Sequence, residues 1–582
     1  MKRKNFTLIM MALLASGACS KDNITTLTTG DTTTPASTVD VPGEDEEDNI
    51  ANTNFARTVS ITWSSSSVSV DGDENGIVSV SGTDVTIDNT ATGEKVYYKL
   101  SGTCSDGSLK IYSVNKQALE LNGLNLTNPD GAAINNQGKK RCFVVVNGTN
   151  KLADGSSAAY AATGDEDMKA VFFSEGQLIF SGSGSLSITA SNSQGKASLT
   201  SDDYIRVLAS GPSITVNSGS SAGHGIRGKD YILIDGGTIS ATVAAAMKKG
   251  FSSDSLVVFT GGTTTINVTG GSAYDSEDND YSGSAGIKAD YAFKMTGGNV
   301  SITNSGAGGK GIKVGGSSDK GVYIFTSEIS GGNLDIKVTG SNYTAGDVSA
   351  KGFKIGWAVK SGTKAGNWGF GGPGGPGGPG GNPGGMGGGS TYSAMTGDLL
   401  VSGGSVSVTC SGNEALEVKK TLTVTGGEVF AYSAADDAIN SASTFTVSGG
   451  KVCGISTAND GLDANGNFYI NGGIVYGSGA GSPELGIDAN TEGGFKLYIQ
   501  GGTVVALGGI ENGASVSQKS SSASWSKNTW YGITAGSTSF ALKTPSGGGS
   551  GMYLYGDATP SVKSGVPPSG TSFWSGYGYT SF

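Results

Sequence analysis

Residues 403–473 read GGSVSVTCSGNEALEVKKTLTVTGGEVFAYSAADDAINSASTFTVSGGKVCGISTANDGLDANGNFYINGG. A Gly-Gly pair recurs in this stretch at 403, 426, 449 and 472, each 23 residues after the last. A fixed period of 20 to 50 residues is the mark of a protein built from stacked repeats. The repeat therefore has to be interpreted before any single motif in the chain.

The apolar positions inside the repeat predict its structure. Leu422 and Val424 precede one Gly-Gly pair and Val429 follows it, and the neighbouring units repeat this alternation of apolar and polar residues. Such alternation is typical of strands, and no run has helical spacing. A third apolar column follows at Leu416, Ile439 and Leu462. Each unit thus predicts about three short strands, and the chain predicts an all-β fold, a single-stranded parallel β-helix with β caps at both ends.

The chain begins with a targeting segment at residues 1–19. Lys2, Arg3 and Lys4 precede an apolar run from Phe6 to Ala15, which is too short to span a bilayer, and small residues lead to Cys19. The segment resembles a bacterial lipoprotein signal, in which the cysteine is lipidated; the alternative is an ordinary secretory signal. We expect an exported outer-membrane lipoprotein at the cell surface, in contact with the membrane only through the lipid on Cys19.

The rest of the chain divides by composition and period. We predict a disordered tether at 20–57, because this acidic, Thr-rich segment has too little apolar content to order itself. An N-terminal β cap at 58–125, coils at 126–510 and a C-terminal cap at 511–582 follow. A Gly/Pro-rich insertion at 366–390 interrupts the period and is predicted to leave the coil at a turn.

The C-terminal cap is rich in aromatic residues, which either close the end of the solenoid or stack on sugar rings. They are Trp525, Trp530, Tyr531, Tyr553, Tyr555, Trp574, Tyr577 and Tyr579.

Composition excludes some classes of function. The formal net charge of −11 argues against binding to nucleic acid, which requires clustered Lys and Arg. Cys104, Cys142, Cys410 and Cys453 show no metal-site spacing and are expected to be buried and unpaired. We expect a monomer.

Aligning the coils on the third apolar column reveals a stripe of charge that changes sign. Basic residues occupy it in the earlier coils, at Arg227, Lys288, Lys310, Lys313, Lys351 and Lys354. Acidic residues occupy it after the insertion, at Glu414, Glu417, Asp436, Asp437, Asp460, Asp463 and Asp488.

Stacked coils place equivalent charges about 4.8 Å apart, where like charges repel by about 1 kcal/mol even in water. The acidic set therefore predicts a Ca²⁺ site, since Ca²⁺ takes several carboxylate and amide oxygens. The basic set predicts a linear polyanion, such as the carboxylates of an acidic polysaccharide. The alternative is a polar face whose long side chains extend into solvent.

Four recurring motifs carry a family resemblance: GIRGKD at 225–230, GIKA at 286–289, DDAI at 436–439 and DGLDANG at 460–466. With the strand, Gly-Gly, strand pattern that follows them, they resemble the bacterial carbohydrate-binding right-handed parallel β-helix family, which is related in shape to pectate lyases. The resemblance covers about residues 60–580. It implies a right-handed coil, binding of polysaccharides such as cellulose or polygalacturonate, and calcium. The acidic motif positions of the family map onto Asp436, Asp437, Asp460, Asp463 and Asp488.

Three functions are consistent with these features. We expect a surface-anchored, non-catalytic protein that binds acidic or plant-type polysaccharides in the presence of calcium. The first alternative is a calcium-dependent polysaccharide lyase of the pectate type, with a basic residue as the proton acceptor. The second is a structural stalk or adhesin. The single histidine, His224, argues against catalysis that depends on histidine.

Overall fold

A computed structural model gives the fold. It describes residues 42, 45–157, 160, 164, 166–192, 197–277, 279–315, 325–360 and 392–582. The signal with Cys19 and the Gly/Pro insertion at 366–390 lie outside the described residues. Within the described ranges, none of the helices has the length and apolar content needed to cross a membrane.

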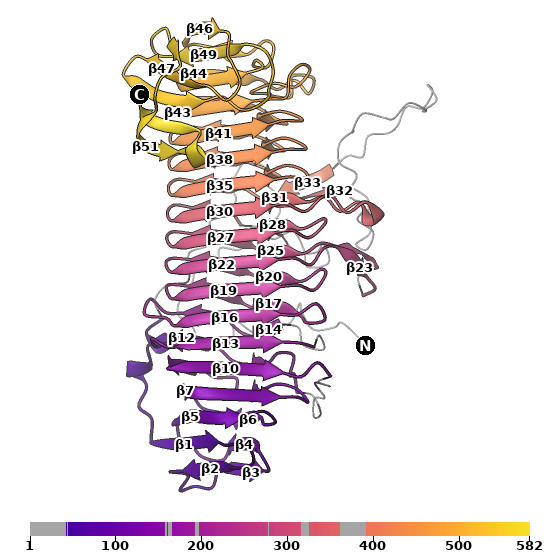
Figure 1. Cartoon of the computed structure of the whole chain (residues 1–582), viewed down its shortest axis with the longest axis vertical. Coiled ribbons are helices and arrows are strands. Elements are labelled where there is room, and N and C mark those ends of the chain that lie inside the picture. Colours follow the sequence, from indigo (N-terminus) through magenta and orange to yellow (C-terminus); the bar gives the residue numbers. More distant parts are fainter. Residues whose placement is uncertain are drawn as a thin grey trace.

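The described chain is all-β and has the form of a solenoid: successive coils stack along one axis, as Figure 1 shows. Its helical residues form only short 3-10 turns. These are η1 (Glu46–Asp48), η2 (Ile50–Asn52), η4 (Thr344–Gly346) and η5 (Trp574–Gly576).

Each regular coil contributes three strands to three parallel ladders, as the repeat predicted. The first ladder is the 14-stranded sheet, in which only the terminal pair, β3 and β4, is antiparallel. Its strands are β3 (Val78–Ser81), β4 (Asp84–Asn89), β6 (Leu109–Ser113), β8 (Ile134–Asn136), β11 (Phe172–Ser174), β14 (Ala197–Ser201), β17 (His224–Gly228), β20 (Lys249–Ser253), β25 (Ala285–Ala289), β28 (Lys310–Val314), β31 (Lys351–Ile355), β36 (Leu416–Val418), β39 (Ile439–Ser441) and β42 (Leu462–Ala464).

The other two ladders join into the 29-stranded sheet, because long strands run through both. One ladder holds the strands before the turn that a Gly-Gly pair forms in the coils from β18 onward. These strands are β9 (Cys142–Asn147), β12 (Leu178–Ser181), β15 (Ile205–Val207), β18 (Tyr231–Ile234), β21 (Leu256–Phe259), β26 (Ala292–Met295), β29 (Ser327–Ile329), β34 (Leu399–Val401), β37 (Leu422–Val424) and β40 (Phe445–Val447). The strands after these turns are β10 (Thr149–Asp154), β13 (Ser185–Ala190), β16 (Ser213–Ser218), β19 (Thr238–Val243), β22 (Thr263–Val268), β27 (Asn299–Asn304), β30 (Asn333–Val338), β35 (Ser405–Cys410), β38 (Glu428–Ser433) and β41 (Lys451–Ser456). The longer or terminal strands of this sheet are β1 (Arg57–Trp63), β5 (Val96–Cys104), β7 (Gln117–Asn128), β43 (Phe468–Ser478) and β44 (Leu497–Leu507).

The Gly-Gly pairs form the tight turn between the last two ladders. The second glycine of each pair has a positive φ, for example +70° at Gly427 and +73° at Gly450. A Cβ on Gly427 would lie 2.6 Å from the backbone of Gly403 in the coil below. Only glycine fits where successive turns stack this closely.

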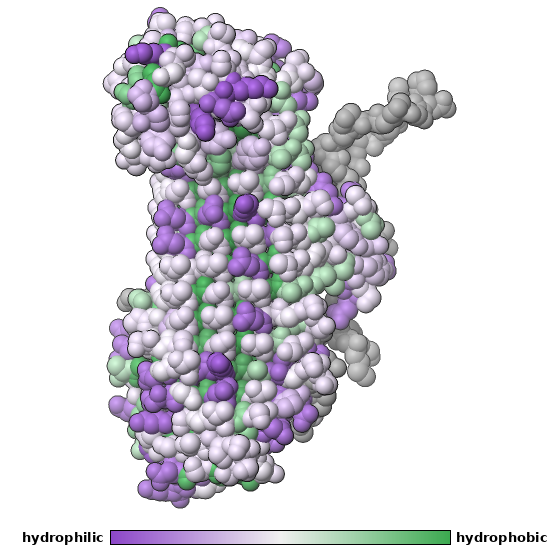
Figure 2. All heavy atoms as spheres, viewed as in Figure 1, coloured by the Kyte–Doolittle hydropathy of each residue, from purple (hydrophilic) through white to green (hydrophobic). Residues whose placement is uncertain are grey.

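The core lies inside the coils and is continuous along the stack. The apolar columns that set the repeat are fully buried there, and Phe445 stacks on Phe468 with the ring centroids 4.3 Å apart. Cys104, Cys142, Cys410 and Cys453 are buried and unpaired, which confirms the prediction for them. Figure 2 shows that side chains of similar hydropathy also align on the outside, in rows along the stack.

The stack begins earlier than the sequence predicted. Strand β1 already pairs in parallel with β5, and β5 with β7, so residues 58–125 belong largely to the coils. Only β2 (Val68–Asp71) and β3 close this end, through antiparallel pairs with β1 and β4. The early coils lack Gly-Gly turns, which is why the period did not reveal them.

The end of the predicted tether docks on the solenoid. The Asp48 side chain is 2% exposed and accepts hydrogen bonds from Arg141 Nε (2.9 Å), Arg206 Nη1 (3.0 Å) and the Tyr204 hydroxyl (2.6 Å). Phe55 packs edge-on against Tyr97. The prediction of disorder is therefore wrong for residues 45–57, because these contacts hold the segment on the outer face of the coils.

Two hairpins leave the coils at turns, on the right in Figure 1. The first pairs β23 (Ala273–Asp275) with β24 (Asp280–Ser282), in the segment between β22 and β25. The second pairs β32 (Trp357–Lys360) with β33 (Tyr392–Thr396), on either side of the Gly/Pro insertion.

The C-terminal segment closes the last coil and folds back along the side of the stack. Strand β49 (Met552–Gly556) pairs antiparallel with β44. Trp574 is fully buried against Tyr476, and Tyr577 stacks on Phe430. The other strands are β45 (Ser515–Val516) and β46 (Lys519–Ala523), with a five-stranded antiparallel sheet of β47 (Trp530–Ala535), β48 (Thr538–Lys543), β50 (Ser561–Ser564), β51 (Ser569–Phe573) and β52 (Gly578–Ser581).

Candidate functional site

The charged stripe predicted from the sequence exists as a row along the 14-stranded sheet. Strand pairing places Lys288 beside Lys313, Lys313 beside Lys354, and Lys354 beside Glu417. The row continues through Asn440 to Asp463. The isoleucine, phenylalanine and leucine residues that precede these positions form the buried column on the inner side of the same strands. The column alignment derived from the sequence is thus confirmed.

At the start of the stripe, Arg227 is already neutralised. Its guanidinium lies between two carboxylates on neighbouring coils, with Nη1 3.1 Å from Asp202 and Nη2 3.1 Å from Asp254. Its side chain is only 12% exposed. Arg227 was predicted to contact a glycan, but this ladder of opposite charges gives it a role in joining three coils instead.

Lys310 is also withdrawn from the surface. Its ammonium donates to the Gly308 carbonyl at 2.9 Å, and a Cβ on Gly283 would touch both this ammonium and Val348. Burial, followed by the charges of Lys313, Lys354 and Lys351, holds the pKa of Lys310 well below its ordinary value. The predicted direct contact of Lys310 with a glycan does not fit this buried position.

The lysines on the coils between β20 and β31 lie close enough to influence one another electrostatically. Burial, followed by the charges of Lys288, Lys313 and Lys248, holds the pKa of Lys249 well below its ordinary value. Lys288 is partly exposed and forms an ion pair with Asp290 at 2.5 Å. The side of the stripe at Lys288 and Lys313 is therefore the part of the basic half that a ligand can approach.

The two halves of the stripe meet in a buried ion-pair network. Lys351 Nζ lies 2.8 Å from both Glu414 and Glu417, and Lys354 lies 3.6 Å from Glu417. Lys419 contacts Glu417 as well. Burial alone would raise the pKa of Glu417, but the three lysines hold it well below its ordinary value.

Three predicted site residues lie in this network. Glu414 and Glu417 were predicted to bind calcium, but lysine ammonium groups already occupy their oxygens. Lys351 was predicted to bind a glycan, but its side chain is 10% exposed and engaged with both glutamates. The sequence alignment could not show this pairing, because the Gly/Pro insertion separates the partners in the chain.

Asp436 is held by a ladder of amides. Asn413 and Asn459, which lie one coil to either side, each donate a side-chain hydrogen bond of 2.9 Å to its carboxylate. The Asp437 amide donates a third at 3.0 Å. This carboxylate is thus satisfied by the protein and is a poor candidate for a metal ligand.

The remaining carboxylates form a concentrated group on three successive coils. Asn440 donates to Asp437 at 3.2 Å and to Asp463 at 2.5 Å, so one amide lies between two carboxylates. All three residues are less than a tenth exposed. Asp437 also accepts the Asp460 amide at 3.1 Å, and Asp460 accepts the Leu485 amide.

The pKa values of these groups reflect burial and mutual repulsion. Burial, followed by the charge of Asp463, raises the pKa of Asp437 well above its ordinary value. Burial also raises the pKa of Asp460 and of Asp463 to about 7. For Asp488, burial and the hydrogen bond with Glu511 raise the pKa to about 9. Unlike Glu417, these acids form no ion pair with a lysine or arginine within the described residues.

The donor chemistry of this group suits a hard cation, since carboxylate and amide oxygens are the ligands of Ca²⁺. Within the described ranges, no three carboxylate, histidine or cysteine side chains converge closely enough to hold an ion by themselves. Of this group, Asp437, Asp463 and the side-chain oxygen of Asn440 are the ligands that would hold such an ion.

Sequence reasoning missed an aromatic group beside the basic half. The ring centroids of Tyr274 and Tyr281 on the β23–β24 hairpin lie 5.3 Å apart, and those of Tyr281 and Tyr343 lie 5.9 Å apart. Tyr274 is 49% exposed. These rings come from two turns of different coils, so no single repeat contains the signal for them.

Comparisons with known proteins concern part of the chain. A solved structure, the gadolinium derivative of a polysaccharide lyase-like protein from C. thermocellum, is 19% identical with a TM-score of 0.34, and the similarity covers 51% of this chain and 99% of that one. Comparison with curated proteins gives no match. A family model described as "Carbohydrate-binding domain-containing protein" matches residues 81–246. Over that range, which ends before the lysine and carboxylate coils of the stripe, the chain is similar to a carbohydrate-binding family, as its motifs predicted.

Proposed function

We propose that the protein is a surface-anchored, non-catalytic polysaccharide-binding protein whose stripe binds acidic, plant-type glycans in the presence of calcium. The observation that carries this proposal is the row of lysines that strand pairing stacks on successive coils, Lys288 beside Lys313 and Lys313 beside Lys354, where like charges repel one another. A polyanion that follows the row offsets this repulsion on every coil. The exposed Tyr274 ring lies at the edge of the row, where a sugar ring can stack.

Three further features belong to the proposal. Lipidation of Cys19 would anchor the chain at the outer membrane, and residues 20–44 would connect the anchor to the docked segment at Asp48. The coil is right-handed, since crossovers between parallel strands have this hand in about 98% of cases. The protein acts as a monomer, because the glycan row lies within one chain.

Replacing Lys288 and Lys313 together with alanine is expected to weaken retention of polygalacturonate about tenfold, because two ammonium groups leave the accessible part of the row. Affinity electrophoresis or calorimetry with polygalacturonate measures the effect. Raising the salt concentration should weaken the wild type more than the variant, since the lost contacts are ionic.

A matched control removes two exposed lysines from the 29-stranded sheet, Lys151 and Lys337, with the same change in net charge. This control should retain polygalacturonate like the wild type. Equal loss in both variants would mean that only net charge matters and would overturn the assignment of the stripe. If the wild type retains neither acidic nor neutral glycans, the stalk function replaces the proposal.

Lys354 favours a second candidate function, a calcium-dependent polysaccharide lyase. Burial lowers the pKa of Lys354 to about 8, although the charge of Glu417 opposes the change. Strand pairing places Lys354 two coils from Asn440 and three from Asp463. An amine with this pKa can accept the proton from the carbon beside a uronate carboxylate. The C–H electron pair then forms the C=C bond, the glycosidic C–O bond breaks, and water protonates the leaving oxygen.

If the lyase function holds, Lys354→Ala should lower the rate at least about a hundredfold, the usual contribution of a general base. Ultraviolet absorbance of the unsaturated sugar ends gives the rate. The wild-type rate should rise with pH and level off above about 8, because the neutral amine is the reactive form. Retention of polygalacturonate without any unsaturated product would exclude the lyase and leave the binding function.

A further inference from the structure

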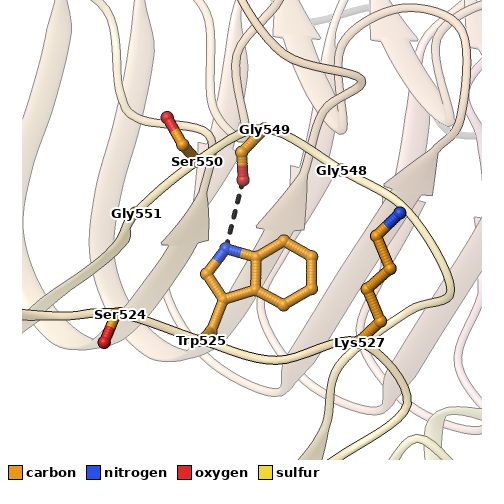
Figure 3. A pocket seen from close by; sticks show the side chains of 7 residues that line it. All are labelled: Ser524, Trp525, Lys527, Gly548, Gly549, Ser550 and Gly551. Carbon is orange, nitrogen blue, oxygen red and sulfur yellow. Dashed lines mark hydrogen bonds between the residues drawn. The ribbon is translucent and has the colours of Figure 1, made fainter.

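A hollow in the C-terminal cap contains an aromatic ring, two hydroxyls and an ammonium group, and it is not part of the stripe. Residues 524–527, between β46 and β47, face residues 548–551, between β48 and β49, around a space of about 310 Å³. Figure 3 shows the Trp525 indole in the middle of this hollow, with Lys527 on one side of it.

The indole is fixed in place before any ligand arrives. Trp525 Nε1 donates to the Gly549 carbonyl at 3.1 Å, and the ring packs at the edge of the apolar cluster of the cap. Hydrogen bonds also hold its chain segment in place. The Ser526 amide donates to the Tyr531 hydroxyl, and the Thr544 hydroxyl donates to the Ser526 carbonyl. A ring that is already ordered loses little entropy when a sugar stacks on it.

Glycines line the hollow opposite the ring. Gly548 has a φ of +146°, and a Cβ on Gly549 would collide with Gly508 at 2.5 Å. Glycine is therefore needed at both positions for the loop to follow this path beside the indole.

The polar side chains around the ring are available to a ligand. In the part of the chain that the structure describes, the side chains of Ser524, Ser550 and Lys527 form no hydrogen bond or ion pair with the protein. An aromatic face with hydroxyls at its rim suits the apolar face and the hydroxyls of a pyranose ring. One ammonium group beside it suits a carboxylate on that sugar.

The hollow also lies close to the acidic end of the stripe. The Gly549 amide donates to the Gly479 carbonyl at 2.9 Å, and the same loop reaches Asp460 through the Leu485 amide. A single loop thus separates the hollow from the carboxylate group, which a linear polysaccharide can span.

We propose that this hollow is a sugar-binding subsite in which a pyranose unit of an acidic polysaccharide stacks on Trp525 and places its carboxylate near Lys527. This inference rests on the proposed glycan-binding function and adds a second contact point at the end of the stripe.

The test is calorimetric titration of the full-length protein with oligogalacturonate and with a neutral cello-oligosaccharide. Trp525→Ala is expected to weaken binding of oligogalacturonate about tenfold, because the variant loses the stacking contact with the sugar and the apolar area that this contact buries. Ser550→Phe, which fills the hollow from its exposed rim, should weaken binding similarly and guards against misfolding of the alanine variant. Lys527→Ala should weaken binding of the acidic ligand and leave the neutral one unchanged.

Trp530→Ala is the matched control, because it removes an indole that contacts Tyr579 in the same cap. It should bind like the wild type. If Trp525→Ala and Ser550→Phe bind like the wild type, the subsite is overturned while the proposed function stands. If the wild type binds neither ligand, the proposed function fails and the subsite fails with it.

Discussion

Glu417→Gln is expected to lower the free energy of unfolding by about 3 kcal/mol, the lower end of the cost of leaving a buried ion without its partner. Glutamine keeps the shape of the side chain and removes only its charge. The Glu417 side chain is 1% exposed, and three lysines surround it. Lys351 keeps Glu414 as a partner, but Lys354 loses the carboxylate that it contacts at 3.6 Å.

The pH dependence of this loss has a defined sign. The folded state holds the pKa of Glu417 below the ordinary value of 4.5, so its contribution is complete above pH 4.5 and declines as the pH falls through the folded value. The difference between wild type and variant should therefore be constant at neutral pH and shrink in acid. Urea unfolding at a series of pH values measures it.

Two companion variants decide whether the charge is responsible. Adding Lys354→Met to Glu417→Gln removes the ammonium that has lost the Glu417 carboxylate and should recover part of the stability, which a double-mutant cycle measures. Asp398→Asn removes a more exposed ion pair with Lys420, 3.5 Å long, and should cost less than about 1 kcal/mol. A loss at Asp398 as large as that at Glu417 would contradict the buried-pair explanation.

The sequence predicted the register of the stripe because residues one repeat apart in the chain become neighbours on adjacent coils of the solenoid. Each coil is one repeat, so the column of Leu416, Ile439 and Leu462 fixes which residues become neighbours on the outside. No long-range information was needed beyond the period. For the same reason, the Gly-Gly turns and the three strands of each coil could be predicted from local patterns.

The predictions that differ from the structure involve ion pairs between segments that are far apart in the chain. Arg206 and Asp48 are 158 residues apart, and Lys351 and Glu414 are 63 apart with an insertion between them. A column alignment shows that charges are adjacent along the stack, but not which of them pair. It therefore predicted calcium at Glu414 and Glu417, where lysines supply the positive charge. Disorder at Asp48 was predicted from the low apolar content of its segment, which does not show that two arginines of the coils bind this carboxylate.

Where no lysine is present, calcium is the proposed source of positive charge, and its removal should make stability fall as pH rises. Asp460 and Asp463 have pKa values raised from 3.8 to about 7, so the folded state favours their protonated forms. Stability without calcium is then highest near pH 4 and declines up to about pH 7, with Asp488 extending the decline to about pH 9. Ionising one group with such a shift costs about 4 kcal/mol.

Adding Ca²⁺ should reverse this decline, because the ion binds the ionised carboxylates of the folded state. At a free concentration of about 100 times its Kd, Ca²⁺ stabilises the protein by about 2.7 kcal/mol. The effect should be large at pH 8 and small at pH 5, where protons occupy the same oxygens. Thermal unfolding at both pH values, with Ca²⁺, Mg²⁺ or EDTA, measures it.

Asp437→Asn combined with Asp463→Asn should remove the response to Ca²⁺, since it neutralises the two carboxylates that Asn440 bridges. It should lessen the pH-dependent decline without abolishing it, because Asp460 and Asp488 still ionise. Asp275→Asn combined with Asp280→Asn changes the net charge equally in the β23–β24 hairpin and should leave both effects intact. Equal stabilisation by Mg²⁺, which demands a tighter octahedral site, would argue against a calcium site. A calcium response that persists in the Asp437 and Asp463 variant would mean that the ion binds elsewhere. Calcium would then not explain how these buried carboxylates lie so close together.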